Sequence, residues 1–291
     1  MALVAGALGC AHPRSGAVQD AVTRSTYASD NGARAFVLFT PSSLPRQASA
    51  RALVVMLHGC TQSADDMARG TRMNAAAAAS GFLVLYPEQT VAAHPLKCWN
   101  WYTASQYARD SGEAALLAGL IDSVTRAEGV DARHVALVGM SAGAVMAANL
   151  VAAYPERYSA LAMHSGLPAL SATDAVGAMG AMKNGAAGGD SLGLRALAVM
   201  GARARPIPVI VLHGAADKLV APINLEAVRR QWTIVNRGIQ PVEEHLLEGV
   251  GHAWSGGSDK GSYTAPNGPD ATGLIVAFLL RAGVLPPRLP F

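Results

Sequence analysis

Short apolar runs alternate with helical stretches along this chain, and this alternation limits its fold more than any other feature. Residues 52–57 form a continuous, partly β-branched apolar run, which is typical of a strand buried on both faces inside a parallel sheet. Similar runs occur at residues 82–86, 134–138, 160–163, 208–212 and 244–247. Helical stretches alternate with them at residues 65–80, 112–128, 142–154, 225–236 and 270–281. Repeated strand-helix-strand units predict an α/β fold with a mostly parallel sheet and helices on both faces.

These units are expected to form a single domain. The chain has 291 residues, of which 51% are hydrophobic, so it can bury one sizeable core. We expect an irregular N-terminal arm over residues 1–33 and one domain over residues 34–291, beginning with a strand at 35–39. Residues 165–205 are rich in Gly and Ala and predict a small insertion of short helices and loops near the carboxyl edge of the sheet. This insertion could equally well be a lid over the active site or a segment that only packs against the rest of the domain.

Charge and hydropathy argue against two classes of partner. The chain has 23 basic and 20 acidic residues, a net charge of +3, and its arginines are scattered. A nucleic-acid-binding surface is therefore not expected. The longest apolar runs, such as 274–280, fall well short of the roughly 18–20 residues that a membrane-spanning helix needs. We expect no transmembrane segment.

A serine lies at the junction between a predicted strand and a predicted helix. Residues 139–143 read Gly-Met-Ser-Ala-Gly, directly after the strand at 134–138. A serine on such a sharp turn needs small neighbours, because bulk at either flanking position would collide with the backbone. The backbone N–H of Ala142 is at the helix N-terminus, where it is free to face an anion. This pattern predicts that Ser141 is a nucleophile.

Two later strands end near residues that can activate this serine. A serine hydroxyl is a poor nucleophile unless a base takes its proton and an acid orients that base. In α/β-hydrolases these residues occur along the chain in the order serine, acid, histidine. Asp217 lies just past the strand at 208–212, and His252 lies on the loop after the strand at 244–247. Because open α/β sheets build active sites at the carboxyl ends of strands, we predict a triad of Ser141, Asp217 and His252.

Other residues compete for the roles of base and acid. His58, His164 and His213 also lie at strand ends, although histidines at such positions more often brace the core or a loop. Asp190 and Glu226 are alternative acids, but the first lies in the predicted insertion and the second lies inside a predicted helix. Position along the chain therefore favours Asp217 and His252.

Two backbone N–H groups are predicted to form an oxyanion hole. Ester cleavage passes through a tetrahedral intermediate whose oxyanion needs hydrogen-bond donors already in place, each worth about 3 kcal/mol. One predicted donor is the N–H of Ala142, the residue after the nucleophile. The second should come from the loop after the strand at 52–57, where we predict the N–H of Cys60, with that of Thr61 as the alternative.

Six segments spread along the chain carry distinctive motifs. They are residues 57–62 (LHGCTQ), 70–74 (GTRMN), 86–89 (YPEQ), 98–101 (CWNW), 139–143 (GMSAG) and 251–257 (GHAWSGG). Together, in this order, they resemble the poly(3-hydroxybutyrate) depolymerase family of esterases. That family is related to the feruloyl and acetylxylan esterases of carbohydrate esterase family one. The resemblance covers roughly residues 34–283 and implies an α/β-hydrolase fold, no cofactor and usually secretion.

The resemblance also implies an activity. It indicates a serine carboxylesterase that hydrolyses short-chain hydroxyalkanoate esters, of the polyhydroxybutyrate type, through an acyl-enzyme. A feruloyl or acetylxylan esterase acting on plant polysaccharide esters is the alternative, because the geometry of a triad does not specify an acyl group. A non-catalytic protein that binds a polymer or glycan is a third hypothesis. The expected partner is an ester, either soluble or polymeric, and the oligomeric state stays open.

Three tryptophans are candidates for substrate binding. Trp254 is two residues after His252, and the resemblance supports a substrate-binding role for it. Trp99 and Trp101 alternate around Asn100, so both would point the same way if this segment is extended. Substrate contact and a structural role as core or loop anchors are both open for Trp99 and Trp101.

The three cysteines are Cys10, Cys60 and Cys98. They allow either one disulfide and a spare thiol or three free thiols, and they form no C-x-x-C pair that would support a cysteine-based metal site. Cys60 and Cys98 flank predicted active-site loops, and together with the family resemblance this implies a Cys60–Cys98 disulfide.

The N-terminal residues give evidence on whether the protein is exported from the cytoplasm. Residues 2–9 are apolar and lead into Cys10, as in the tail of a secretory or lipoprotein signal, but no Lys or Arg precedes Arg14. A disordered terminus or a misplaced start codon is an equally good explanation. Export to the periplasm or the extracellular space is our expectation, with a lipid anchor at Cys10 as a further hypothesis.

Overall fold

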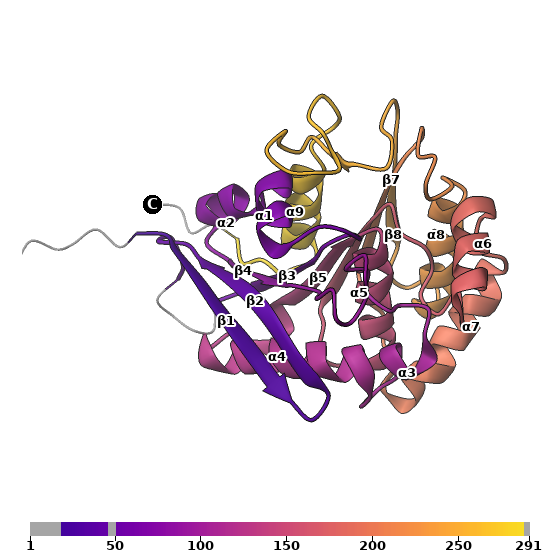
Figure 1. The fold of residues 1–291 in the computed structure, drawn as a ribbon, viewed down its shortest axis with the longest axis horizontal. Coiled ribbons are helices and arrows are strands. Elements are labelled where there is room, and N and C mark those ends of the chain that lie inside the picture. Colours follow the sequence, from indigo (N-terminus) through magenta and orange to yellow (C-terminus); the bar gives the residue numbers. More distant parts are fainter. Residues whose placement is uncertain (1–18, 46–50, 288–291) are drawn as a thin grey trace, which may run out of the picture.

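An eight-stranded sheet forms the centre of the molecule (Figure 1). The computed structural model describes residues 19–45 and 51–287. In spatial order the strands are β1 (Ala21–Ser29), β2 (Gly32–Thr40), β4 (Leu83–Pro87), β3 (Leu53–Leu57), β5 (Val135–Met140), β6 (Ala160–His164), β7 (Val209–Gly214) and β8 (Val242–Leu247). The six strands from β4 to β8 in this order are parallel, whereas β1 and β2 are paired antiparallel at one edge. The predicted mostly parallel sheet is confirmed.

Helices cover both faces of this sheet (Figure 1). One face packs against α1 (Ala64–Thr71), α2 (Met73–Ser80) and α9 (Ala271–Arg281). The other face packs against α4 (Gly112–Ala127), α5 (Ala142–Ala153) and α8 (Asn224–Val235). Successive side chains of a central strand enter opposite layers, as Leu53 and Val54 do, so every residue of β3 is buried. This double burial explains why the central strands are continuous apolar runs.

The remaining elements are short or lie outside the central layers. They are α3 (Ala104–Tyr107), α6 (Ala175–Asn184), α7 (Gly189–Met200), the 3-10 turns η2 (Ala132–His134) and η3 (Gly201–Arg203), and the parallel pair β9 (Trp254–Ser255) and β10 (Thr264–Ala265).

Strand β1 corrects the expectation of an irregular arm over residues 1–33. Its nine residues pair with β2, from Ala21 opposite Thr40 to Ser29 opposite Gly32. Almost every residue of β1 is exposed, so the strand lacks the apolar alternation that reveals a strand in a sequence. The sheet therefore begins at Ala21. Residues 1–18 of the expected arm lie outside the described residues.

The predicted helix over residues 65–80 is divided into α1 and α2. Arg72, between them, adopts the left-handed conformation with φ 58° and ψ 18°. Thr71 stabilises the break, because its Oγ1 donates to the carbonyl of Met67 at 2.8 Å and accepts from the N–H of Met73 at 3.3 Å. Since residue 72 is neither glycine nor proline, nothing local in the sequence marks this boundary.

The predicted insertion over residues 165–205 consists mainly of helices α6 and α7. Figure 1 shows both beside α8, and α7 contacts α8 and α5. Ala196 and Met200 of α7 belong to the main hydrophobic core. Of the two explanations for this segment, the structure favours a packing layer at the side of the sheet over a lid.

Within residues 19–45 and 51–287, no helix is both long and apolar enough to cross a bilayer. Cys10 and the apolar residues 2–9, on which the export and lipid-anchor hypotheses rest, lie outside the described residues.

Candidate active site

Ser141 lies on a sharp turn between β5 and α5. Its backbone has φ 53° and ψ −123°, a conformation that a non-glycine residue rarely adopts. The flanking glycines make this turn sterically feasible: a Cβ at Gly139 would lie 2.3 Å from the Gly143 carbonyl oxygen, and one at Gly143 would lie 2.1 Å from the Leu57 carbonyl oxygen. The N–H of Ser141 donates to the His164 carbonyl at 2.9 Å. The close packing between Gly143 and Leu57 also places the end of β3 next to the serine turn.

His252 contacts Asp217 directly. Nδ1 of His252 donates to Oδ2 of Asp217 at 2.7 Å, and the other carboxylate oxygen accepts the N–H groups of Leu219 and Val220, each at 2.9 Å. Two backbone hydrogen bonds join the segments that carry the pair: Ala216 N–H donates to Val250 at 2.9 Å, and Ala215 N–H donates to Leu247 at 2.9 Å. The ends of β7 and β8 therefore hold the two side chains together.

The Asp217 carboxylate is held in its charged form. Burial by itself would raise its pKa, but hydrogen bonds from His213 and His252, and one from the Val220 N–H, outweigh burial and hold the pKa well below its usual range. Nε2 of His213 donates to the Val220 carbonyl at 3.0 Å and lies 3.5 Å from Asp217 Oδ2. A charged carboxylate can fix the orientation of His252 and stabilise its imidazolium form.

Ser141, Asp217 and His252 all lie at the carboxyl ends of strands or on the loops that follow them. Ser141 follows β5, Asp217 follows β7, and His252 follows β8. No hydrogen bond joins the Ser141 hydroxyl to His252 among the described residues. His252 retains 10% of its side-chain exposure. The structure therefore brings Asp217 and His252 into contact and places Ser141 at the same edge of the sheet.

The loop after β3 lies against the serine turn. A Cβ at Gly59 would be 3.6 Å from Cβ of Ser141. The N–H of Thr61 donates to the Leu96 carbonyl at 2.6 Å, so Thr61, the alternative oxyanion donor, already has an acceptor. The N–H groups of Cys60 and Ala142 have no acceptor among residues 19–45 and 51–287. Only these two of the predicted donors are free to bind an oxyanion.

A disulfide joins Cys60 to Cys98, as the resemblance implies. It connects the loop after β3 to the segment that carries Trp99. The same two segments are also joined by a hydrogen bond from the Trp99 indole N–H to the His58 carbonyl at 2.9 Å. These contacts restrain the backbone around Cys60.

The competing histidines and acids have other partners. Burial lowers the pKa of His58 to about 4 and that of His164 to about 3, so both are neutral near pH 7. Both are fully buried, as is His213. Asp190 pairs with Arg230 and Glu226 pairs with Arg229, in exposed ion pairs. None of these side chains is in a position to take the role of Asp217 or His252, but His213 supports Asp217, a contact that sequence reasoning did not foresee.

The family model for esterase PHB depolymerases, where PHB is poly(3-hydroxybutyrate), matches residues 35–244. The chain belongs to this family. Poly(3-hydroxyalkanoate) depolymerase C of Paucimonas lemoignei is 32% identical to this PHB depolymerase family member over 198 residues, which cover 66% of the chain and 46% of that protein. Acetylxylan esterase A of Emericella nidulans is 27% identical over 206 residues, covering 68% of the chain and 66% of that protein. The chain thus spans only part of the length of these relatives.

A solved structure shows the same fold. The acetyl xylan esterase from Aspergillus awamori superposes with a TM-score of 0.69 at 19% sequence identity, covering 80% of this chain and 94% of that one. This likeness supports the predicted α/β-hydrolase fold of this PHB depolymerase family member.

The three tryptophans are buried, so the structure offers no accessible indole face for the substrate contact expected of Trp254 and left open for Trp99 and Trp101. Trp254 is 1% exposed; its indole stacks on His164 and its Nε1 donates to Thr272 at 3.0 Å. Trp99 and Trp101 are 0% and 4% exposed. A side chain without an accessible face cannot bind a substrate in this conformation. In this PHB depolymerase family member the three indoles belong to the hydrophobic cores on the two faces of the sheet.

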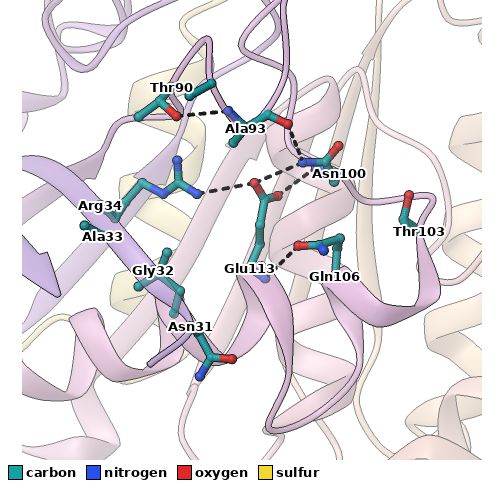
Figure 2. A pocket seen from close by; sticks show the side chains of 12 residues that line it. Asn31, Gly32, Ala33, Arg34, Thr90, Ala93, Asn100, Thr103, Gln106 and Glu113 are labelled. Atoms are coloured by element: carbon teal, nitrogen blue, oxygen red, sulfur yellow. Dashed lines mark hydrogen bonds and ion pairs between the residues drawn. The ribbon is translucent and has the colours of Figure 1, made fainter. Parts of the chain in front are cut away.

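A pocket of about 480 Å³ lies between the β1–β2 turn, the loop after β4 and the start of α4 (Figure 2). Its lining includes Arg34, Asn100 and Glu113 but none of Ser141, Asp217 and His252. No group of three or more His, Cys, Asp or Glu side chains suited to a metal ion occurs among the described residues.

Proposed function

We propose that this chain is a serine carboxylesterase that hydrolyses short-chain hydroxyalkanoate esters through an acyl-enzyme. Ser141 is the nucleophile, His252 the general base and Asp217 the acid that orients it, while the N–H groups of Cys60 and Ala142 bind the oxyanion. The observation that carries the proposal is the 2.7 Å contact between His252 Nδ1 and Asp217 Oδ2, at the sheet edge where Ser141 occupies its constrained turn.

Each step follows from these positions. Ser141 Oγ attacks the ester carbonyl carbon while Nε2 of His252 takes the hydroxyl proton. The carbonyl oxygen becomes an oxyanion that accepts hydrogen bonds from Cys60 and Ala142. Collapse of the tetrahedral intermediate breaks the bond to the alcohol oxygen, which leaves with the proton from His252. A water molecule, deprotonated by His252, then attacks the acyl-Ser141 carbonyl carbon, and the acyl–Oγ bond breaks as His252 returns the proton to Ser141 Oγ and the acid is released.

Asp217 contributes by its charge and by its position. Its hydrogen bond from Nδ1 fixes the tautomer of His252, so that Nε2 is the nitrogen available to Ser141. Its carboxylate also stabilises the imidazolium that forms during each proton transfer. Two backbone N–H groups and the nearby His213 keep this carboxylate oriented.

The similarity to poly(3-hydroxyalkanoate) depolymerase C supports hydroxyalkanoate esters as the substrate class. A feruloyl or acetylxylan esterase is the second candidate, because an acetylxylan esterase A is 27% identical and another acetyl xylan esterase shares the fold at a TM-score of 0.69. A panel of purified-protein assays separates them: a hydroxybutyrate trimer, polyhydroxybutyrate film, methyl ferulate and acetylated xylan. The proposal expects the highest kcat/KM on the hydroxybutyrate trimer, and a higher value on methyl ferulate or acetylated xylan would contradict the substrate assignment.

Export is part of the proposal because of the Cys60–Cys98 disulfide. Disulfides persist in oxidising compartments, so we propose the periplasm or the extracellular space. Thiol alkylation and peptide mapping of protein isolated from each cell fraction test this point, and the linked pair is expected in the exported fraction. A Cys10 lipid anchor is tested by radioactive fatty-acid labelling of the parent and of Cys10→Ala. Labelling of the parent alone supports the anchor, and no labelling of either rejects it.

A further inference from the structure

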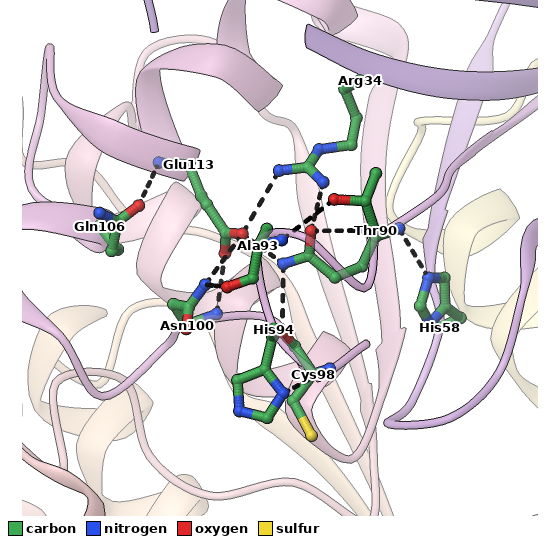
Figure 3. Close-up of polar contacts among 10 residues, drawn as sticks. Arg34, His58, Thr90, Ala93, His94, Cys98, Asn100, Gln106 and Glu113 are labelled. Carbon is green, nitrogen blue, oxygen red and sulfur yellow. Dashed lines mark hydrogen bonds and ion pairs between the residues drawn. The ribbon is translucent and has the colours of Figure 1, made fainter. Parts of the chain in front are cut away.

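A buried carboxylate organises the residues behind the proposed oxyanion hole. Glu113, in the first turn of α4, is 4% exposed. Its oxygens accept the backbone N–H of Asn100 at 2.8 Å and the Asn100 side-chain amide at 3.2 Å. They also accept a hydrogen bond from Arg34, at 3.4 Å (Figure 3), and one from the side-chain amide of Gln89. One side chain therefore joins β2, the loop after β4 and α4.

Gln89 connects Glu113 to His58 through hydrogen bonds of its side chain and its backbone. Its side-chain oxygen accepts from Arg34 and its side-chain nitrogen donates to Glu113 and, at 3.1 Å, to the Cys98 carbonyl. With the side chain held on both sides, the backbone N–H of Gln89 donates to Nε2 of His58 at 3.0 Å. The side chains of Arg34, Glu113, Gln89 and His58 are each at most 4% exposed, which limits competition from water for these hydrogen bonds.

The hydrogen bond from Gln89 determines which nitrogen of His58 carries the proton. Because Nε2 accepts from the Gln89 N–H, the proton of the neutral imidazole is on Nδ1. Nδ1 lies 2.7 Å from the carbonyl oxygen of Gly59 and therefore donates to it. The neutral form is maintained because burial lowers the pKa of His58 to about 4.

The carbonyl that His58 holds belongs to the same peptide group as the N–H of Cys60. In a trans peptide the C=O and N–H are coplanar and point in opposite directions, so fixing one fixes the other. If this peptide rotated, the Cys60 N–H would turn away from the carbonyl oxygen of the substrate. Hydrogen bonds to an oxyanion are effective only when their donors are already oriented.

We propose that His58 is a positioning residue that orients the Cys60 N–H by binding the Gly59 carbonyl, and that the buried chain Glu113–Gln89 fixes the tautomer it needs. This inference rests on the proposed function, because it assigns a task to the oxyanion donor of the same site. It predicts that His58 contributes to kcat without touching the substrate.

The test compares two substitutions at residue 58. In His58→Leu a side chain of similar volume fills the space but donates no hydrogen bond to Gly59. In His58→Asn the side-chain nitrogen can occupy the place of Nδ1 and donate to the same carbonyl. For nitrophenyl butyrate, we expect kcat of His58→Leu to fall at least tenfold, with KM within threefold of the parent, because one misplaced oxyanion donor costs up to about 10²–10³ in kcat. We expect His58→Asn to recover most of the loss.

A matched control separates positioning from general destabilisation. Asn236 is also fully buried, and its side chain binds the backbone of Ile207 just before β7, at the opposite edge of the sheet from Ser141. Asn236→Ala should lower the melting temperature while kcat stays within twofold of the parent. Glu113→Gln provides a second variant within the network if His58→Leu does not fold, and a selective fall in kcat is expected for it too.

Two outcomes would overturn the inference. One is a parental kcat in His58→Leu and in Glu113→Gln. The other is an equal loss of kcat in His58→Leu and His58→Asn that follows their loss of melting temperature. Ser141→Ala distinguishes these results from failure of the proposed function: if it is inactive while His58→Leu keeps full kcat, only the positioning role is wrong, whereas an active Ser141→Ala contradicts the serine mechanism itself.

Discussion

The indole of Trp254 stacks on the imidazole of His164, with ring centroids 5.1 Å apart and planes inclined by 23°. Trp254 is only two residues after His252, so this stack anchors the loop that carries the proposed base. The N–H of Ser255, next in the chain, donates to Nε2 of His164 at 3.3 Å. Because the N–H of Ser141 donates to the His164 carbonyl, one buried histidine connects the loop of His252 to the turn of Ser141.

Trp254→Ala should therefore reduce activity through the structure of the site. Removing a buried tryptophan typically lowers the free energy of unfolding by about 3–5 kcal/mol. We expect kcat/KM to fall by a similar factor for nitrophenyl acetate and for a hydroxybutyrate trimer, together with a lower melting temperature. A loss confined to the larger ester at an unchanged melting temperature would show that the indole contacts substrate after all.

The charge of Asp217 should be essential. In Asp217→Asn the side chain keeps its shape, but the amide no longer provides a carboxylate to hold the Nδ1–H of His252. We expect kcat to fall by about 10⁴, which is less than the loss in Ser141→Ala. Asp190→Asn is the matched control, because Asp190 pairs with Arg230 on the surface. The expected kcat of this control is that of the parent, and comparable losses in both variants would argue against Asp217 as the acid.

Stability should decrease as the pH falls below about 6.5. Burial lowers the pKa of His58 to about 4 and that of His164 to about 3, from an ordinary value of 6.5. Between about pH 6.5 and 4 the unfolded chain therefore binds protons that the folded chain does not, so the free energy of unfolding falls with falling pH. Asp217, with its lowered pKa, adds a further loss only below the pKa of an unfolded aspartate, which is about 4.

Urea denaturation between pH 7.5 and 4.5 measures this dependence. His164→Gln removes one titrating group, so its free energy of unfolding should vary less steeply with pH than that of the parent, whatever its absolute stability. Identical slopes for the parent and the variant would rule out a neutral, buried His164.

The Cys60–Cys98 disulfide should support both stability and catalysis. The bond closes a sequence separation of 38 residues, which corresponds to about 4 kcal/mol in the chain-entropy model. We expect the double variant Cys60→Ser/Cys98→Ser to unfold at a lower temperature and to have a lower kcat, because Cys60 carries the proposed oxyanion donor. Dithiothreitol should affect the parent in the same direction and leave the double variant unchanged. Equal melting temperatures for the oxidised parent and the double variant would contradict this role.

The sequence predicts those parts of the molecule whose apolar residues form a clear pattern. The central strands are continuous apolar runs, and α4 and α8 have apolar residues at helical spacing, so their existence and order follow from the pattern. Strand β1 was missed because it is exposed almost throughout and is stabilised by pairing with β2. The break at Arg72 was missed because it depends on hydrogen bonds of Thr71, and residue 72 itself is neither glycine nor proline.

Some features of the candidate site could likewise be predicted from the sequence, and others could not. Ser141, Asp217 and His252 follow strands, so the topology brings them to one edge, and the sequence is sufficient to nominate them. The burial of Trp254 was not foreseeable, because an indole suits a core and a binding surface equally well. The network around Glu113 joins residues up to 79 positions apart, and no local sequence pattern predicts such contacts.

The central claim is that Ser141 is the nucleophile, and covalent labelling tests it most directly. The parent and Ser141→Ala should be incubated with a fluorophosphonate probe, digested and mapped by mass spectrometry, with hydrolysis of nitrophenyl butyrate measured on the same samples. The account predicts a single modified residue, Ser141, with loss of activity in proportion to labelling, and neither labelling nor turnover in Ser141→Ala. Modification of a different residue, or ester turnover by Ser141→Ala near the parental rate, would contradict it.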